Sequence, residues 1–283
     1  MRAPDAILPL WPEGVPAALA NMGEELGDGN CVWNVSLPTI SWYKAQAPNG
    51  CAVIICPGGG YRQLSMDGEG AQYAAWLTNL GVHSFVLKSR IAPCEHPAPL
   101  LDVLRAMRLV RWFAPGFGID PERIGIAGSS AGGHLGACAG TLFEHLAGKT
   151  GHQLDAVSAR PDFMMLLYPV ITIEGPACHM GSRQALLGQA PGADHLALMS
   201  LERQVSPATP PTLLIHTQED QAVPAENSIL FYQALCRAGV PAALHIFEKG
   251  PHGVGMREGL GPMSGWPALA EAWLRDRELL AVP

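Results

Sequence analysis

The sequence predicts an α/β fold in which helices cover both faces of a mostly parallel central sheet. After residue 50, short continuous apolar segments alternate with segments of helical periodicity along most of the chain. Apolar segments bounded by turn residues are typical of strands buried on both faces, and their alternation with helices is typical of parallel sheets. Apolar residues make up 48% of the 283 residues, which supplies a large core and excludes a disordered chain. We expect a single domain over residues 1–283.

The first 50 residues do not show this alternation. Residues 1–30 are rich in Pro, Gly, Asn and Asp, and we expect them to run over the surface. The segments Cys31–Ser36 and Thr39–Lys44 alternate apolar and polar residues on either side of Pro38. This pattern predicts two short antiparallel strands.

Six apolar segments are predicted as strands and five periodic segments as helices. Gly81 and Gly239 directly follow two of the helices, where a left-handed residue is favoured. The predicted strands are Cys51–Cys56, Val82–Leu87, Ile124–Ala127, Phe163–Tyr168, Thr212–His216 and Ala243–Phe247. The predicted helices are Ala71–Leu80, Leu100–Phe113, Ala131–Leu146, Ala225–Ala238 and Pro267–Leu279.

The stretch Thr172–Pro211 interrupts the alternation. It contains two short helical patterns, Arg183–Leu187 and His195–Leu201, among glycine and proline. We expect a short insertion at about 172–211 rather than a separate domain, because about 40 residues are too few for an independent core.

Charge and cysteine content exclude several classes of function. The net charge is −7 and only 15% of residues are charged, so we expect no nucleic-acid partner. None of the seven cysteines forms a C-x-x-C pair and several lie in apolar runs, which predicts reduced thiols and a cytoplasmic location. No apolar run has the length of a signal peptide or a membrane span, so we expect no membrane partner. Metal-ligand spacings are missing too, so neither a metal nor a cofactor is expected, and the oligomeric state is left open.

The strongest chemical motif is Gly128-Ser-Ser130-Ala-Gly132, between a predicted strand and a predicted helix. A G-x-S-x-G motif in this context is typical of a nucleophile elbow, a sharp turn that exposes the central serine at a helix N-terminus. Ser130 is therefore the predicted nucleophile. Ser129 is the alternative, but it lacks glycines two residues away on both sides. An ordinary glycine-rich turn is the other interpretation.

Three glycines, Gly58–Gly60, follow the predicted strand Cys51–Cys56 after Pro57. Their backbone N–H groups lie at the carboxyl edge of the sheet, where they can stabilise an oxyanion. We predict an oxyanion hole formed by the N–H groups of Gly59, Gly60 and Ala131, although a glycine triplet alone is more often a simple loop. The next residue, Tyr61, is predicted to line the substrate pocket, with plain loop packing as the alternative.

A nucleophilic serine needs a base, and the base needs an orienting carboxylate. In this architecture the two follow later strands in the order acid, then histidine. Asp220 follows the strand Thr212–His216, and His252 follows the strand Ala243–Phe247 within a Gly/Pro loop. Glu219 is the competing acid. The other histidines are expected to be structural: His134 packs or caps one helical turn after Ser130, and His83, His216 and His245 fall in predicted strands.

The chain resembles the α/β-hydrolase superfamily and, within it, the small acetylxylan-esterase-like carbohydrate esterases. The resemblance extends over about residues 8–280. It is carried by LPLWPEGVP at 8–16, VIICPGGGYRQLSMDGEG at 53–70, RIGIAGSSAGGHL at 123–135, LLYPVIT at 166–172, PPTLLIHTQEDQAVPAENSILFYQAL at 210–235 and VPAALHIFEKGPHGVGM at 240–256.

The resemblance implies an α/β-hydrolase fold and a metal-free serine esterase acting on O-acetyl groups, commonly of sugars or short xylo-oligosaccharides. Two departures matter. Pro57 stands before the glycine triplet where hormone-sensitive-lipase-like esterases have histidine, which argues against that branch. Glu219 replaces the first residue of the Asp-Asp pair that is usual in such acetyl esterases, while Asp220 keeps the second place.

We therefore expect a small-molecule ester as the substrate and a Ser-His-Asp acyl-enzyme mechanism. A first alternative keeps the triad but cleaves an amide bond, as a formamidase or a small peptidase does. A second alternative is a non-catalytic hydrolase fold that serves only in binding. The natural acyl group and alcohol are left open by the sequence.

Overall fold

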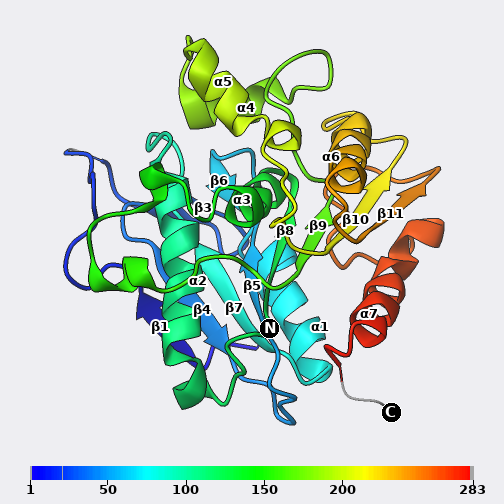
Figure 1. The fold of residues 1–283 in the computed structure, drawn as a ribbon, viewed down its shortest axis with the longest axis horizontal. Coiled ribbons are helices and arrows are strands. Elements are labelled where there is room, and N and C mark those ends of the chain that lie inside the picture. The colour runs from blue at the N-terminus through cyan, green and yellow to red at the C-terminus, as the bar shows by residue number, and fades with distance from the viewer. Residues whose placement is uncertain (1, 21, 281–283) are drawn as a thin grey trace.

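A computed structural model of the chain describes residues 2–20 and 22–280, and its centre is an eight-stranded sheet (Figure 1). From β7 to β11 all neighbouring strands are parallel, whereas β1 and β4 are added antiparallel at one edge. This confirms the predicted mostly parallel sheet. In spatial order the strands are β1 (Ala6–Pro9), β4 (Thr39–Tyr43), β7 (His83–Lys88), β5 (Ala52–Cys56), β8 (Ile124–Ser129), β9 (Met164–Leu167), β10 (Thr212–Thr217) and β11 (Ala242–Phe247).

Helices cover both faces of this sheet, as the sequence predicts. One face carries α2 (Ala98–Phe117), α3 (Ser130–Thr141) and α6 (Glu226–Arg237), and the other carries α1 (Gln72–Asn79) and α7 (Trp266–Asp276). Along β5, Ile54 packs into the first core and Val53 and Ile55 into the second. Because strand side chains alternate between faces, a continuous apolar strand fills both cores. Gly81 and Gly239 have φ values of 81° and 71°, the left-handed conformation predicted after their helices.

The N-terminal region differs from its prediction. Residues Ala6–Pro9 form β1, an edge strand of the main sheet, and Leu10 and Trp11 are buried. The indole Nε1 of Trp11 donates to Asp102 Oδ1 at 2.8 Å, and Asp102 in turn forms a buried ion pair with Arg90 at 2.8 Å. The expectation that residues 1–30 only run over the surface is wrong here, because a long-range polar contact anchors the segment.

The two predicted N-terminal strands exist but are not partners. Val32–Trp33 (β3) lies in a second sheet between β2 (Leu26–Gly27) and β6 (Gln63–Leu64). Thr39–Tyr43 (β4) pairs antiparallel with β1 and β7 in the main sheet. The local sequence pattern predicts that a strand forms, whereas its pairing partner depends on residues far away in the sequence. The antiparallel character of the two strands was therefore predictable, but their partners were not.

At the other edge, β11 is less buried than the sequence predicts. Its residues are half-buried or exposed, with Ile246 39% exposed, because only β10 is its neighbour. His245 is accordingly half-buried and not a core residue.

The insertion folds as a cap over the carboxyl ends of the strands, at the top of Figure 1. Its two helices are α4 (Met180–Leu187) and α5 (Ala193–Met199), close to the two helical pieces expected from the sequence. Within the residues described, no helix is both long and apolar enough to cross a membrane. The remaining short helices are η1 (Asp67–Ala71), η2 (Leu146–Gly148), η3 (Gln153–Ala156), η4 (Leu201–Arg203) and η5 (Gly261–Gly265).

Candidate active site

Ser130 lies at the sharp turn between β8 and α3. Its φ of +53° is in the left-handed region, which is rare for a residue other than glycine. The preceding residue, Ser129, is extended at φ −117°, so the chain reverses within one residue and Ser130 opens onto the cavity described below. Such local strain occurs where the surrounding structure holds it in place, and it is common at functional sites.

The glycines around Ser130 allow backbone to touch backbone. A Cβ atom on Gly128 would collide with the carbonyl of Gly132, and one on Gly132 would collide with the carbonyl of Cys56. The second contact places the start of α3 directly against the end of β5, next to the glycine triplet. These contacts explain why the turn needs glycine on both sides of its serine.

Replacement of Gly132 by alanine is expected to lower the free energy of unfolding by about 1–3 kcal/mol or more and to reduce activity, since a rigid backbone carbonyl has to move. Thermal unfolding and kcat measure the two effects. Gly116→Ala in α2 is the control, because its Cβ would meet no atom within 4 Å. A Gly132→Ala protein as stable and active as that control would contradict the contact.

His252 connects Ser130 with Asp220. Its Nε2 lies 2.9 Å from Ser130 Oγ, and its Nδ1 lies 2.6 Å from Asp220 Oδ2. A carboxylate can only accept, so Nδ1–H donates to Asp220, and Nε2 is left to accept from the serine hydroxyl. The structure thus brings together all three residues that the sequence predicts for nucleophile, base and acid.

Asp220 is held as an anion. Burial favours the neutral acid, but hydrogen bonds from His216 and His252 and from the Val223 N–H outweigh burial, and the pKa of Asp220 is lowered. His216 was expected to be a core histidine, and it is buried. Its Nε2 also lies 3.4 Å from Asp220 Oδ2, a contact that sequence pattern gave no sign of.

The alternative acid and the alternative nucleophile, Glu219 and Ser129, lie outside this hydrogen-bonded series. Glu219 is exposed and accepts a long hydrogen bond of 3.3 Å from the Gly250 N–H. Ser129 is fully buried, and its hydroxyl lies 3.0 Å from the hydroxyl of Tyr73. Neither side chain contacts His252 among the hydrogen bonds of the described residues.

The glycine triplet forms one wall of the cavity, with Gly59 and Gly60 both at positive φ. Across residues 2–20 and 22–280, no hydrogen bond uses the N–H of Gly59 or Gly60. The first glycine differs, since the Gly58 N–H donates to Glu69 Oε2 at 2.9 Å. Ala131 is the second residue of α3, where helix N–H groups have no partner within the helix. These are the donors an oxyanion hole requires.

The prediction that Tyr61 lines the pocket is wrong. Its side chain is 4% exposed, and its hydroxyl lies 2.8 Å from Nδ1 of buried His134. Nε2 of His134 lies 2.9 Å from the carbonyl of Met199, so Nε2 carries the proton and Nδ1 accepts from Tyr61. Burial lowers the pKa of His134 to about 4, which keeps the ring neutral. Tyr61 therefore packs under the glycine loop and fixes it from the core side.

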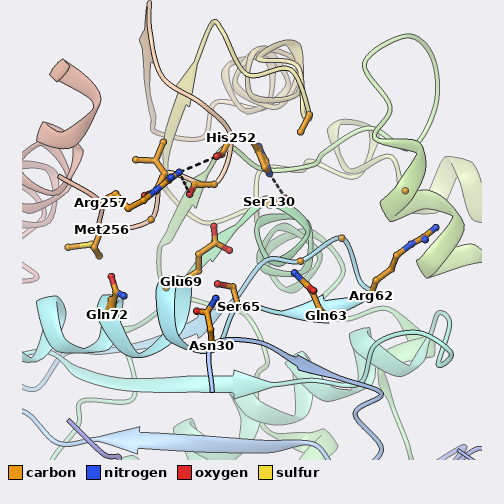
Figure 2. Close-up of a pocket in the computed structure, with 18 of the residues that line it drawn as sticks. Asn30, Arg62, Gln63, Ser65, Glu69, Gln72, Ser130, His252, Met256 and Arg257 are labelled. Carbon is orange, nitrogen blue, oxygen red and sulfur yellow. Dashed lines mark hydrogen bonds between the residues drawn. The ribbon is translucent and has the colours of Figure 1, made fainter. Parts of the chain in front are cut away.

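A cavity of about 770 Å³ lies over Ser130 and His252 (Figure 2). Most of the lining residues have polar side chains or are glycines, and Glu69 is the carboxylate among those described. The insertion contributes only His179 and Gly181, so it borders the cavity without closing it. The polar side chains include Asn30, Arg62, Gln63, Ser65, Gln72 and Arg257. In the part of the chain described, no three His, Cys, Asp or Glu residues are arranged to hold a metal ion.

Comparison with known proteins identifies a family model and a solved structure that match this chain. The BD-FAE family model matches residues 43–235. The chain is 37% identical to an acetyl ester-xyloside bifunctional hydrolase from Caldicellulosiruptor lactoaceticus, whose crystal structure superposes with a TM-score of 0.87 over 99% of both chains. The predicted α/β-hydrolase fold and the predicted resemblance to acetylxylan esterases are thereby confirmed.

Two curated relatives are longer proteins. The chain is 34% identical over 217 residues to an acetylxylan esterase of Xylanibacter ruminicola, covering 75% of this chain and 43% of the relative. It is 37% identical over 206 residues to endo-1,4-beta-xylanase B of Butyrivibrio fibrisolvens, covering 71% of this chain and 32% of the relative. The chain thus spans less than half of the length of either relative.

Proposed function

Since the chain belongs to the BD-FAE family of α/β-hydrolase esterases, we propose that it is a serine esterase that removes acetyl groups from sugars or xylo-oligosaccharides. The observation that carries the proposal is the hydrogen-bonded series from Ser130 through His252 to Asp220, which opens into the polar cavity. The relatives' names support the acetyl and xylan part of the proposal.

In the proposed mechanism, Ser130 Oγ attacks the acyl carbon while its proton passes to His252 Nε2. Asp220 accepts from Nδ1–H of His252, which fixes the ring orientation and stabilises the imidazolium that forms. The N–H groups of Gly59, Gly60 and Ala131 stabilise the oxyanion of the tetrahedral intermediate. His252 then protonates the leaving alcohol, and water attacks the acyl-enzyme by the same path in reverse.

The composition of the cavity supports a hydroxylated alcohol. Amides and hydroxyls along its floor can exchange hydrogen bonds with sugar hydroxyls, whereas a lipid tail would leave them unpaired. Arg62 and Arg257, on opposite sides in Figure 2, extend this polar lining.

The test is hydrolysis of acetylated xylo-oligosaccharides, followed as acetate release, beside nitrophenyl acetate and a matched nitroanilide. Release of acetate from the oligosaccharide with little cleavage of the anilide supports the proposal. Preferred cleavage of the amide would favour the formamidase or peptidase alternative. A folded protein inert toward all three would favour a binding function.

Among nitrophenyl esters we expect kcat/KM to be highest for acetate, lower for butyrate and close to zero for octanoate. Among the lining residues described, only Ala222, Val254 and Met256 have apolar side chains, so a growing acyl chain meets few of them. Each methylene that a pocket accepts or rejects changes the activation free energy by about 1–3 kcal/mol. Initial rates on the three esters at matched enzyme concentration measure the trend. A kcat/KM that rises steadily toward octanoate would indicate a lipase-like site instead.

A further inference from the structure

Glu69 is a buried carboxylate at the edge of the cavity that the proposed mechanism does not use. It belongs to the short π-helix η1, is 7% exposed, and points from that segment toward Ser130 and His252 in Figure 2. Burial raises the pKa of Glu69, and hydrogen bonds from Tyr168 and the Gly58 N–H oppose that effect. In the ion pairs of the described residues, no arginine or lysine is paired with it. Burying a carboxylate without a cationic partner costs free energy. The two hydrogen bonds that Glu69 accepts offset part of this cost, and they indicate what the residue does.

The first hydrogen bond fixes the glycine loop. Glu69 Oε2 accepts from the Gly58 N–H at 2.9 Å, and it lies so close that a Cβ on Gly58 would approach it to 2.6 Å. Gly58 is covalently followed by Gly59 and Gly60, the proposed oxyanion donors. A shift of the Gly58 peptide would therefore move those donors directly.

The second hydrogen bond runs through Tyr168 to the His252 loop. Glu69 Oε1 accepts from the Tyr168 hydroxyl at 2.8 Å, and the same hydroxyl accepts from the Gly255 N–H at 3.0 Å. The Tyr168 ring meets the His252 ring edge-on, with centroids 5.1 Å apart.

The same hydroxyl also connects to the elbow. Tyr168 lies 3.1 Å from the Tyr73 hydroxyl, which lies 3.0 Å from Ser129 Oγ. Tyr168 itself is held at φ +37°, a conformation that an ordinary residue adopts only when its surroundings impose it. One largely buried network thus joins the glycine loop, the nucleophile elbow and the histidine loop.

We propose that Glu69 is a positioning residue for this esterase: its carboxylate fixes the oxyanion loop relative to Ser130 and His252, through Gly58 on one side and Tyr168 on the other. This rests on the proposed function of the site. Glu69 touches no reacting atom, so its loss acts through the placement of the Gly59 and Gly60 N–H groups in the transition state.

Two variants separate positioning from charge. Glu69→Ala removes both hydrogen bonds. Glu69→Gln keeps an acceptor for the Gly58 N–H and offers an amide N–H to the Tyr168 oxygen, whose own hydroxyl can then turn toward Tyr73. Asp67→Ala is the matched control, since that carboxylate lies in the same π-helix but bonds Gln72 and not the glycine loop.

The measurements are kcat and KM on nitrophenyl acetate, and binding of a methylboronic acid that forms a tetrahedral adduct with Ser130. For Glu69→Ala we expect kcat to fall about 10²–10³-fold, the cost typical of losing an oxyanion-hole donor, with KM changed by less than about threefold. Boronic acid affinity should fall together with kcat. Glu69→Gln should recover to within about tenfold of wild type, and Asp67→Ala should stay near wild type.

Three outcomes would overturn the proposal. One is a folded Glu69→Ala protein with wild-type kcat. Another is equal impairment of the glutamine and alanine variants with unchanged boronic acid affinity, which would indicate a role for charge. The third outcome is a Tyr168→Phe protein with unchanged kcat. This variant and Glu69→Gln test the proposal even if Glu69→Ala does not fold. Failure of the proposed function is distinct, because it is seen in the wild-type enzyme, which would then prefer the nitroanilide or leave nitrophenyl acetate uncleaved.

Discussion

Ser130→Ala is expected to lower kcat/KM by about 10⁴–10⁶-fold while the protein remains folded. Without Oγ there is no atom to form the acyl-enzyme, and neither His252 nor the oxyanion donors can replace it. The serine side chain is small and borders the cavity, so its loss leaves no void in the core. Steady-state kinetics on nitrophenyl acetate and circular dichroism on the same preparation test both parts.

Ser129→Ala is the neighbouring control. It removes a buried hydroxyl whose partner is Tyr73, so we expect a loss below about tenfold, in the range of one hydrogen bond. An inactive Ser129→Ala protein together with an active Ser130→Ala protein would show that Ser129 is the nucleophile.

Asp220→Asn is expected to lower kcat by about 10⁴-fold with little change in KM. The carboxylate accepts from Nδ1–H of His252 and is kept ionised by its hydrogen bonds. An amide in its place can present N–H to Nδ1, which favours the tautomer in which Nε2 carries the proton and cannot act as a base. Kinetics at several pH values would measure the loss, which should persist across the range.

Glu219→Gln provides the comparison, because it changes the adjacent carboxylate by the same chemical step. Its single hydrogen bond to Gly250 is long and exposed, so activity should stay within about threefold of wild type. Greater loss in Glu219→Gln than in Asp220→Asn would transfer the acid role to Glu219.

The interior of the fold was predictable because its strands are short, continuous and apolar. Cys51–Cys56 reads as a strand buried on both faces, and β5 is buried at every residue. The sheet edges were not predictable in the same way. Ala6–Pro9 has little strand pattern of its own and is placed by pairing with β4, while β11 has an apolar pattern but only one neighbour.

Of the candidate site, the parts determined by local turn chemistry were predictable. The elbow glycines and the loops after β10 and β11 follow from where chain segments end on a parallel sheet. Contacts made at a distance were not. Tyr61 was expected in the pocket because of its neighbours in sequence, yet its hydroxyl is taken by His134, which is 73 residues away. The role of Glu69 could not be predicted for the same reason, because its hydrogen-bond partner Tyr168 is 99 residues away in the sequence.

The contact of Gly132 with the carbonyls of Cys56 and Pro57 also has a dynamic consequence. With no side chain between them, the first turn of α3 and the end of β5 have no soft layer that could absorb relative displacement. Nucleophile and oxyanion loop should therefore fluctuate as one body, and local opening should expose their amides to solvent together, within a single cooperative unit. Heating would then abolish the geometry of the reaction centre in one step, while the half-exposed β11 edge frays earlier and independently.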